Sequence, residues 1–140
     1  MPYLLDTDVV IDWLNHLTVI QPLILRLQGD GVSICVVTYV EVFECVLRGV
    51  DQGAARRQFE AFLTSGPVIP FTLLEAEACA QVRADLGRRG RRARSRYLDL
   101  MIAATLIAHE LTLVTRNVAD YRDVPGLALA SPEQLEASQT

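Results

Sequence analysis

Residues 98–108 read Leu-Asp-Leu-Met-Ile-Ala-Ala-Thr-Leu-Ile-Ala, and the rest of the chain can be arranged around them. The stretch has no Gly or Pro and is apolar except for Asp99 and Thr105, which predicts a helix buried on most sides. A carboxylate inside such a helix is costly unless a partner compensates its charge. The helix dipole favours an anion in the first turn, but by only about 0.3–1 kcal/mol. Asp99 therefore indicates a metal ion or a basic group nearby.

Strand-like and helix-like segments alternate along the chain. Short apolar runs predict strands at 3–6, 32–37, 111–114 and 127–129 and an extended piece at 68–71. Helical patterns lie between them, at 7–14, 17–28 (interrupted by Pro22), 38–47, 54–63 and 72–86, and another begins at Pro132. We therefore expect an α/β fold, a three-layer single domain over 1–140 with a mostly parallel central sheet flanked by helices. Residues 136–140 are expected to be a polar tail.

Composition narrows the class of protein. The chain has 140 residues, 51% of them apolar, which suffices for one domain with a real core. It contains no run of 18 apolar residues and no recognisable signal peptide, so we expect a cytoplasmic protein without a membrane span. The three cysteines lie in apolar segments and are expected to be small buried side chains in a reducing compartment.

Positive charge is unevenly distributed. The net charge is −4 and the chain has no lysine, yet six of its thirteen arginines fall within 88–96, in RRGRRARSR. Such a run can bind phosphates while the whole molecule stays acidic, or it can be a solvated loop. Its position just before Asp99 favours the first interpretation. The candidate phosphate-binding residues are Arg91, Arg92, Arg94 and Arg96, with Arg116 from a later segment.

Acidic side chains follow the predicted strands at the edge where open parallel sheets bind ligands. Asp6 ends the first strand, Glu41 lies one helical turn after the second, and Asn117 and Asp120 follow the strand at 111–114. Asp99 begins the helix that leads into that strand. If this helix runs antiparallel to the strand, Asp99 reaches the same edge, and these side chains converge.

Each acid also has a purely structural interpretation. Thr38-x-x-Glu41 has the spacing of a helix capping box, and the same pattern recurs at Thr72-x-x-Glu75. The remaining candidates could be a helix cap or turn residue, as for Asp8, or loop acids, as for Asp120 and Asp123.

A carboxylate cluster of this kind needs compensation. Two carboxylates about 4 Å apart repel by roughly 4 kcal/mol at an effective dielectric constant of about 20. Without a cation some of them would take up protons. Ligation by oxygen alone suits Mg²⁺ or Mn²⁺ better than zinc. Hydrolysis of a phosphodiester fits this chemistry, with the arginine run contacting phosphates.

Four ordered motifs resemble those of the PIN-domain ribonucleases. They are LLDTDVVID at 4–12, Thr38-x-x-Glu41, Asp99-x-x-Ile102-Ala103-Ala104 and LVTRNxxDY at 113–121. The length of the chain resembles the VapC toxins of type II toxin–antitoxin pairs. The resemblance implies an endoribonuclease that depends on Mg²⁺ or Mn²⁺, acts on RNA, pairs with a cognate antitoxin and forms a homodimer.

The resemblance also implies roles for individual residues. Asp6, Glu41 and Asp99 match the metal-binding, catalytic acids of the family. A fourth acid falls either at the position of Asn117 or three residues later, so Asp120 is the better match in this chain. Because an amide is a weaker ligand than a carboxylate, Asn117 leaves open whether a second metal binds.

The remaining implied roles are supporting ones. Thr115 and Asn117 would orient water or metal ligands, and Asp8 would assist them. Two other functions stay open. One is a catalytically silent PIN-like module that only binds RNA or protein. The other is a phosphatase of the haloacid-dehalogenase type, in which Asp6 would be the nucleophile and Asp8 the general acid, although the chain lacks the lysine expected there.

Overall fold

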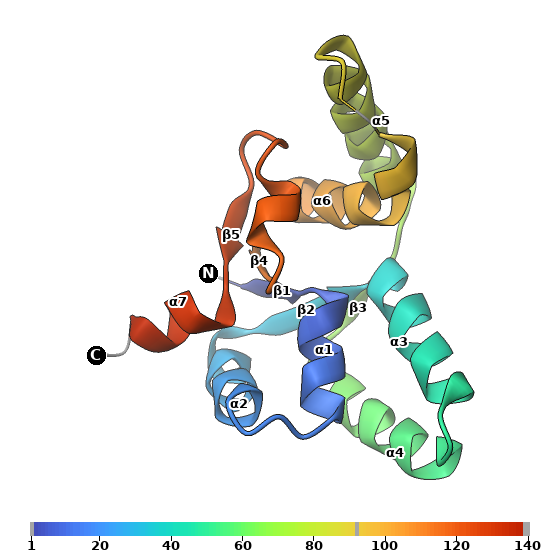
Figure 1. Ribbon diagram of the computed structural model, residues 1–140, viewed down its shortest axis with the longest axis vertical. Coiled ribbons are helices and arrows are strands. Elements are labelled where there is room, and N and C mark those ends of the chain that lie inside the picture. The colour runs from blue at the N-terminus through green and yellow to red at the C-terminus, as the bar shows by residue number, and fades with distance from the viewer. Residues whose placement is uncertain (1, 92, 139–140) are drawn as a thin grey trace.

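A parallel sheet organises the protein, whose computed structural model describes residues 2–91 and 93–138 (Figure 1). Within them, five strands lie in the order β3-β2-β1-β4-β5, and every neighbouring pair is parallel. The strands are β1 (Tyr3–Leu5), β2 (Val32–Cys35), β3 (Val68–Ile69), β4 (Thr112–Val114) and β5 (Ala128–Ala130). The expected three-layer α/β architecture is confirmed, and the sheet is parallel throughout.

Helices connect these strands and cover both faces of the sheet. They are α1 (Thr7–Leu14), α2 (Ile20–Asp30), α3 (Val36–Arg48), α4 (Gln52–Leu63), α5 (Leu73–Arg88), α6 (Tyr97–His109) and α7 (Pro132–Ala137). Two short 3₁₀ turns complete the secondary structure: η1 (Arg94–Arg96) precedes α6, and η2 (Val118–Tyr121) follows β4. None of the helices in the described part of the chain is long and apolar enough to cross a membrane.

The strands are apolar on both faces because each face packs against helices. Successive side chains of a strand point to opposite sides, so Leu5 and Leu4 belong to different cores. Leu5 packs among side chains of α1, α2, α3 and α4, whereas Leu4 packs against α6. Figure 1 shows α1 to α4 on one side of the sheet and α5 with α6 on the other. This burial explains why unbroken apolar runs, without alternation, predicted these strands.

Helix α6 is the apolar segment from which the fold was inferred. Ala103 and Ala104 are fully buried and let α6 approach the sheet and α5 closely. Leu98 and Ile107 are partly exposed, at 50% and 39%, so the helix is buried on fewer sides than predicted. Its first turn carries Asp99 at the carboxyl edge of the sheet, as the antiparallel packing requires.

A buried acid ties α5 to the end of α6. Glu75 accepts hydrogen bonds from the backbone N–H of Thr72, at 2.6 Å, and from the Thr72 hydroxyl. Its other oxygen lies 2.8 Å from His109 Nε2. These donors lower the pKa of Glu75 to about 2, the Thr72 hydroxyl most strongly. We refer to Thr72, Glu75 and His109 as the α5–α6 clasp.

Several predicted boundaries are wrong by a few residues. Strand β2 ends at Cys35, so α3 begins at Val36, two residues before the expected start. Pro22 lies in the first turn of α2, where its missing N–H costs nothing, and does not interrupt the helix. Helix α5 passes through Gly87, and α7 continues to Ala137, which shortens the expected polar tail.

Candidate active site

The site lies where the strand order reverses, between β1 and β4. The chain proceeds from β1 to β2 and β3 on one side, then crosses to β4 and β5 on the other. Ligands of open α/β sheets bind at the carboxyl ends of the strands flanking such a point. Asp6 follows β1, and Thr115 follows β4. The Asp6 N–H donates a 2.9 Å hydrogen bond to the carbonyl of Val114, the last residue of β4, which ties the ends of the two strands together.

Asp6 occupies the centre of the site. It is the N-cap of α1, and its Oδ1 accepts a 2.8 Å hydrogen bond from the N–H of Thr7. Its Oδ2 accepts bonds from Thr115 Oγ1 at 2.8 Å and from the Tyr121 hydroxyl at 3.2 Å. Only 6% of Asp6 is exposed, and this burial raises the pKa of its carboxyl despite these donors. The charge of Asp120 raises that pKa further.

Asp99 reaches the same hydroxyl from the other side. Its Oδ1 lies 3.5 Å from the Tyr121 oxygen, at the outer limit of a hydrogen bond. Burial raises the pKa of Asp99, and the charges of Asp6 and Asp120 add to the effect. Burial beside these acids also raises the pKa of Tyr121, so the phenol remains protonated and can donate. Asp6 and Asp99 thus face each other across one shared hydroxyl.

Glu41 joins the cluster through Thr7. The Thr7 hydroxyl donates a 2.6 Å hydrogen bond to Glu41 Oε1, while the Thr7 N–H bonds Asp6. Partial burial raises the pKa of Glu41, and the charges of Asp6 and Asp99 raise it further. The capping-box interpretation of Thr38-x-x-Glu41 is wrong, because Thr38 lies inside α3 and is fully buried.

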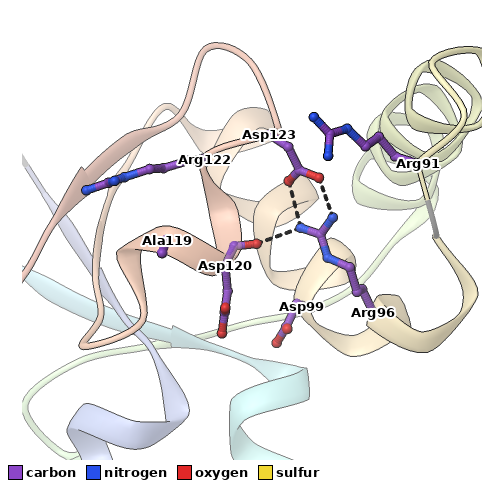
Figure 2. A pocket seen from close by; sticks show the side chains of 7 residues that line it. All are labelled: Arg91, Arg96, Asp99, Ala119, Asp120, Arg122 and Asp123. Carbon is purple, nitrogen blue, oxygen red and sulfur yellow. Dashed lines mark hydrogen bonds and ion pairs between the residues drawn. The ribbon is translucent and has the colours of Figure 1, made fainter.

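Asp120 flanks a neighbouring pocket of about 500 Å³ (Figure 2). Its side chain and that of Asp99 point into the same space, away from the ion pair between Arg96 and Asp123. That pair is bidentate, with N–O distances of 2.6 and 2.9 Å. Arg96 also donates to the backbone carbonyl of Asp120 at 2.6 Å, which fixes η2 against the start of α6.

The candidate phosphate-binding arginines have different surroundings. Arg91 lines the pocket beside Asp120, and Arg94 lines an adjoining pocket of about 390 Å³ that includes Glu41 and Asp99. Arg96 is engaged with Asp123, as described above. Two further candidates complete the set: Arg116, which is paired with Asp12 at 3.0 Å, and Arg92, which lies outside the described residues.

Asp8 and Asn117 form a second layer beside Asp6. Asp8 Oδ2 accepts bonds from the backbone N–H of Arg116, at 3.1 Å, and from Asn117 Nδ2, at 3.0 Å. The N–H of Asn117 donates to Thr115 Oγ1 at 3.0 Å. Burial, together with the charge of Asp6, raises the pKa of Asp8 to about 6. The N-cap of α1 is Asp6, and Asp8 lies in the first turn of the helix.

The sequence that forms this site matches the model of a known protein family. The model of the PIN domain matches residues 3–127, which include every strand except β5 and all the acids of the site. The chain belongs to the PIN-domain family. The alternative of a haloacid-dehalogenase phosphatase is therefore set aside.

Known proteins of similar length align along nearly the whole chain. Ribonuclease VapC2 of Rickettsia felis is 24% identical over 131 residues, which are 92% of this chain and 96% of that protein. The crystal structure of VapBC2 from Rickettsia felis, bound to a promoter DNA fragment, matches with a TM-score of 0.84 and 23% identity. DNA-bound VapBC from Salmonella typhimurium matches with a TM-score of 0.83 and 22% identity. Each structural match covers 94% of this chain and 98% of the other.

The carboxylates of this PIN domain are donors of the kind that bind divalent cations. Their arrangement, however, does not form a closed set of ligands. Among the described residues, no group of three or more His, Cys, Asp or Glu side chains is arranged to hold a metal ion. The groups that meet are all oxygen donors, and they raise each other's pKa by repulsion. A hard divalent cation such as Mg²⁺ or Mn²⁺ relieves that repulsion and is suited to such donors.

Two residues of the PIN site were missed from the sequence. Thr7 holds both Asp6 and Glu41, and Tyr121 bridges Asp6 and Asp99. Both lie directly beside predicted acids in the sequence. Adjacency was the available signal, but a neutral hydroxyl gives no electrostatic reason to single it out.

Proposed function

We propose that this PIN domain is an endoribonuclease that hydrolyses RNA phosphodiesters with Mg²⁺ or Mn²⁺. One observation carries the proposal. Asp6, Glu41 and Asp99 are linked by hydrogen bonds through Thr7 and Tyr121, and their like charges repel one another. Such a cluster costs stability unless it serves a cation. The name of the similar Rickettsia felis protein, a ribonuclease, supports the same activity.

The proposed ligands of the ion are Asp6, Glu41, Asp99 and Asp120. A bound divalent cation supplies a more acidic water and stabilises negative charge on a phosphoryl oxygen. Tyr121 and the N–H of Thr7 hold the two oxygens of Asp6 in fixed directions. The supporting residues are Thr115 and Asn117, with Asp8 behind them.

The proposed RNA contacts lie on the arginine side of the site. Arg91 and Arg94 line pockets that also contain Asp99, so a phosphate backbone passing there meets both positive charge and the acids. Arg92 belongs to the same run in the sequence. Arg96 and Arg116, also expected to contact RNA, already pair with Asp123 and Asp12.

The proposed partners are a cognate antitoxin and a second copy of this chain. Both structural matches above are complexes named VapBC, which supports a toxin–antitoxin pair. Exposed apolar side chains on α2, α3 and α5 offer contact surfaces, namely Leu25, Val40 and Leu73. An RNA substrate and free cysteines fit the reducing cytoplasm; Cys35 and Cys79 are buried as expected, whereas Cys45 is exposed.

Cleavage of cellular RNA by the purified, antitoxin-free protein tests this function. We expect discrete fragments with Mg²⁺ or Mn²⁺, none with EDTA, and none from the Asp99→Asn variant. Glu136→Gln, an exposed change on α7, is the matched control and should cleave normally. Folded protein that binds RNA but never cleaves it would contradict the proposal and favour the silent binding module.

A further inference from the structure

Two acids on α1 share one arginine on the far side of Asp6. Asp8 and Asp12 lie one helical turn apart, and Asp12 is only 7% exposed. Arg116, from the segment after β4, places Nε 3.0 Å from Asp12 Oδ2 and 3.8 Å from Asp8 Oδ2. Asp12 is the last residue of the LLDTDVVID motif, but it is not among the proposed metal ligands. The buried Asp12 is explained by the segment that Arg116 belongs to, residues 115–117.

Both acids depend on that arginine. Like charges four residues apart on a helix repel, and a buried carboxylate without compensation is costly. Asp8 Oδ1 and Asp12 Oδ2 are buried and accept no hydrogen bond among the described residues, so the ion pair with Arg116 is what compensates Asp12 Oδ2. Removing the Arg116 guanidinium would leave the buried Asp12 carboxylate without its ion-pair partner, whereas Asp8 would keep its bonds from the Arg116 N–H and Asn117. The Arg116 side chain, 51% exposed, is thus anchored to α1 mainly through Asp12.

The anchored residue lies between two residues of the site. Thr115 donates to Asp6 Oδ2 at 2.8 Å and accepts the N–H of Asn117 at 3.0 Å. Asn117 and the Arg116 N–H both donate to Asp8 Oδ2. Because the Thr115 hydroxyl accepts from one side and has one proton to give, its proton is directed to Asp6. Anchoring Arg116 thus fixes the direction in which Asp6 is held.

We propose that Asp12 and Arg116 form a positioning pair that clamps residues 115–117 onto α1 and thereby orients Asp6. The inference rests on the proposed nuclease function for its effect on catalysis. In this role Arg116 acts through Thr115 and Asn117, which differs from the contact with RNA expected from the sequence. Asp12 acts only through Arg116.

Kinetics of two single variants and their double variant test the clamp. Asp12→Asn and Arg116→Gln should each lower kcat by about 10- to 100-fold while KM changes less than about twofold. The double variant should lose little more than either alone, because the two residues act as a unit. Arg116→Lys, which keeps the charge, should recover part of kcat. The exposed pair Arg56 and Glu60 on α4 gives the matched control, since Glu60→Gln and Arg56→Gln should change neither constant.

The opposite role predicts a different pattern. If Arg116 contacts phosphate, Arg116→Gln raises KM and reduces the salt slope of RNA binding by about one, while Asp12→Asn leaves kcat intact. That pattern would overturn the clamp, as would normal kcat in both single variants.

Amide hydrogen exchange separates the clamp from the nuclease assignment. In the metal-free protein, Asp12→Asn should speed exchange at Arg116 and Asn117, with little change in the strands. Unchanged exchange there overturns the clamp even if RNA is cleaved. Failure of the wild-type protein to cleave RNA overturns the nuclease and the catalytic part of this inference, while exchange still decides whether the pair fixes 115–117.

Discussion

Two segments with the same Thr-x-x-Glu spacing take opposite roles in this protein. Thr72 precedes α5, and Glu75 folds back onto it and onto His109. Thr38 lies inside α3, and Glu41 accepts its hydrogen bond from Thr7, beside the acids of the site. The spacing is identical; what differs is where the helix begins.

The electrostatic consequences are equally opposed. Donors surround Glu75 and lower its pKa to about 2, whereas burial and the charges of Asp6 and Asp99 raise the pKa of Glu41. A carboxylate with donors on every side stabilises the fold. One that faces other carboxylates is poised for a cation. The contrast teaches that the surroundings of an acid, more than its motif, separate a structural role from the catalytic role proposed for Glu41.

Activity should separate the two glutamates most strongly. Glu41→Gln keeps the shape and the bond from Thr7 but removes a charge from the acid cluster, so we expect kcat to fall about 100-fold or more. Glu75→Gln should stay within about twofold of wild type. Initial rates on one RNA oligonucleotide with Mn²⁺ measure both. Equal losses of kcat in the two variants would contradict the different roles assigned to Glu41 and Glu75.

Thermal stability should reverse the order. Glu75→Gln weakens the α5–α6 clasp and should lower the midpoint of unfolding by a few degrees. Glu41→Gln relieves repulsion and should leave the midpoint of the metal-free protein unchanged or higher. Differential scanning calorimetry in EDTA compares them. A large loss of stability in Glu41→Gln would place Glu41 among the structural acids.

The pH dependence of stability should carry opposite signs. Because the folded pKa of Glu75 lies below its ordinary 4.5, its contribution is present above pH 4.5 and is lost as the pH falls toward 2. Because the folded pKa of Glu41 is raised, its contribution is present below 4.5 and is lost as the pH rises through the folded value. In EDTA, any gain from Glu41→Gln should therefore grow from pH 4 to pH 8, and a gain that shrinks would contradict the assignment.

The smallest expected effect is on RNA binding by variants of Arg91 and Arg96. Arg91→Gln should reduce the salt slope of RNA binding by about one, because Arg91 lines the pocket beside the acids. Arg96→Gln should change the slope less and destabilise η2 instead, since Arg96 is engaged with Asp123 and the Asp120 carbonyl. Binding of a 2′-O-methyl RNA across a salt series distinguishes them. The reverse ranking would assign RNA contact to the paired arginine.

The sequence predicted those features that depend on local pattern. Apolar runs without alternation indicated a doubly covered parallel sheet, and the position of Asp99 in an apolar helix pointed to the acid cluster. The meeting of Asp6 with Asp99 followed from where parallel strands end. These inferences need only the direction of the chain and the cost of burying charge.

Other features depended on contacts between distant residues. Whether α3 began at Val36 or Thr38 depends on where β2 ceases to pair with its neighbours, and that boundary decided the role of Glu41. The acidic partners of Arg96 and Arg116 lie on other segments, so the sequence could not reveal that these two arginines are already engaged in ion pairs. Thr7 and Tyr121 contribute to the site only through where the fold places their hydrogen-bond donors, which the sequence does not show.

The central place of β1 also sets the order in which the protein can assemble during synthesis. Asp6 emerges from the ribosome early, but its hydroxyl partners Thr115 and Tyr121 follow 109 and 115 residues later. The middle of the sheet stays open until β4 inserts beside β1. A growing chain therefore lacks an ordered acid cluster for most of its translation. If the protein cuts RNA as proposed, its site becomes complete only after β4 and η2 have been synthesised.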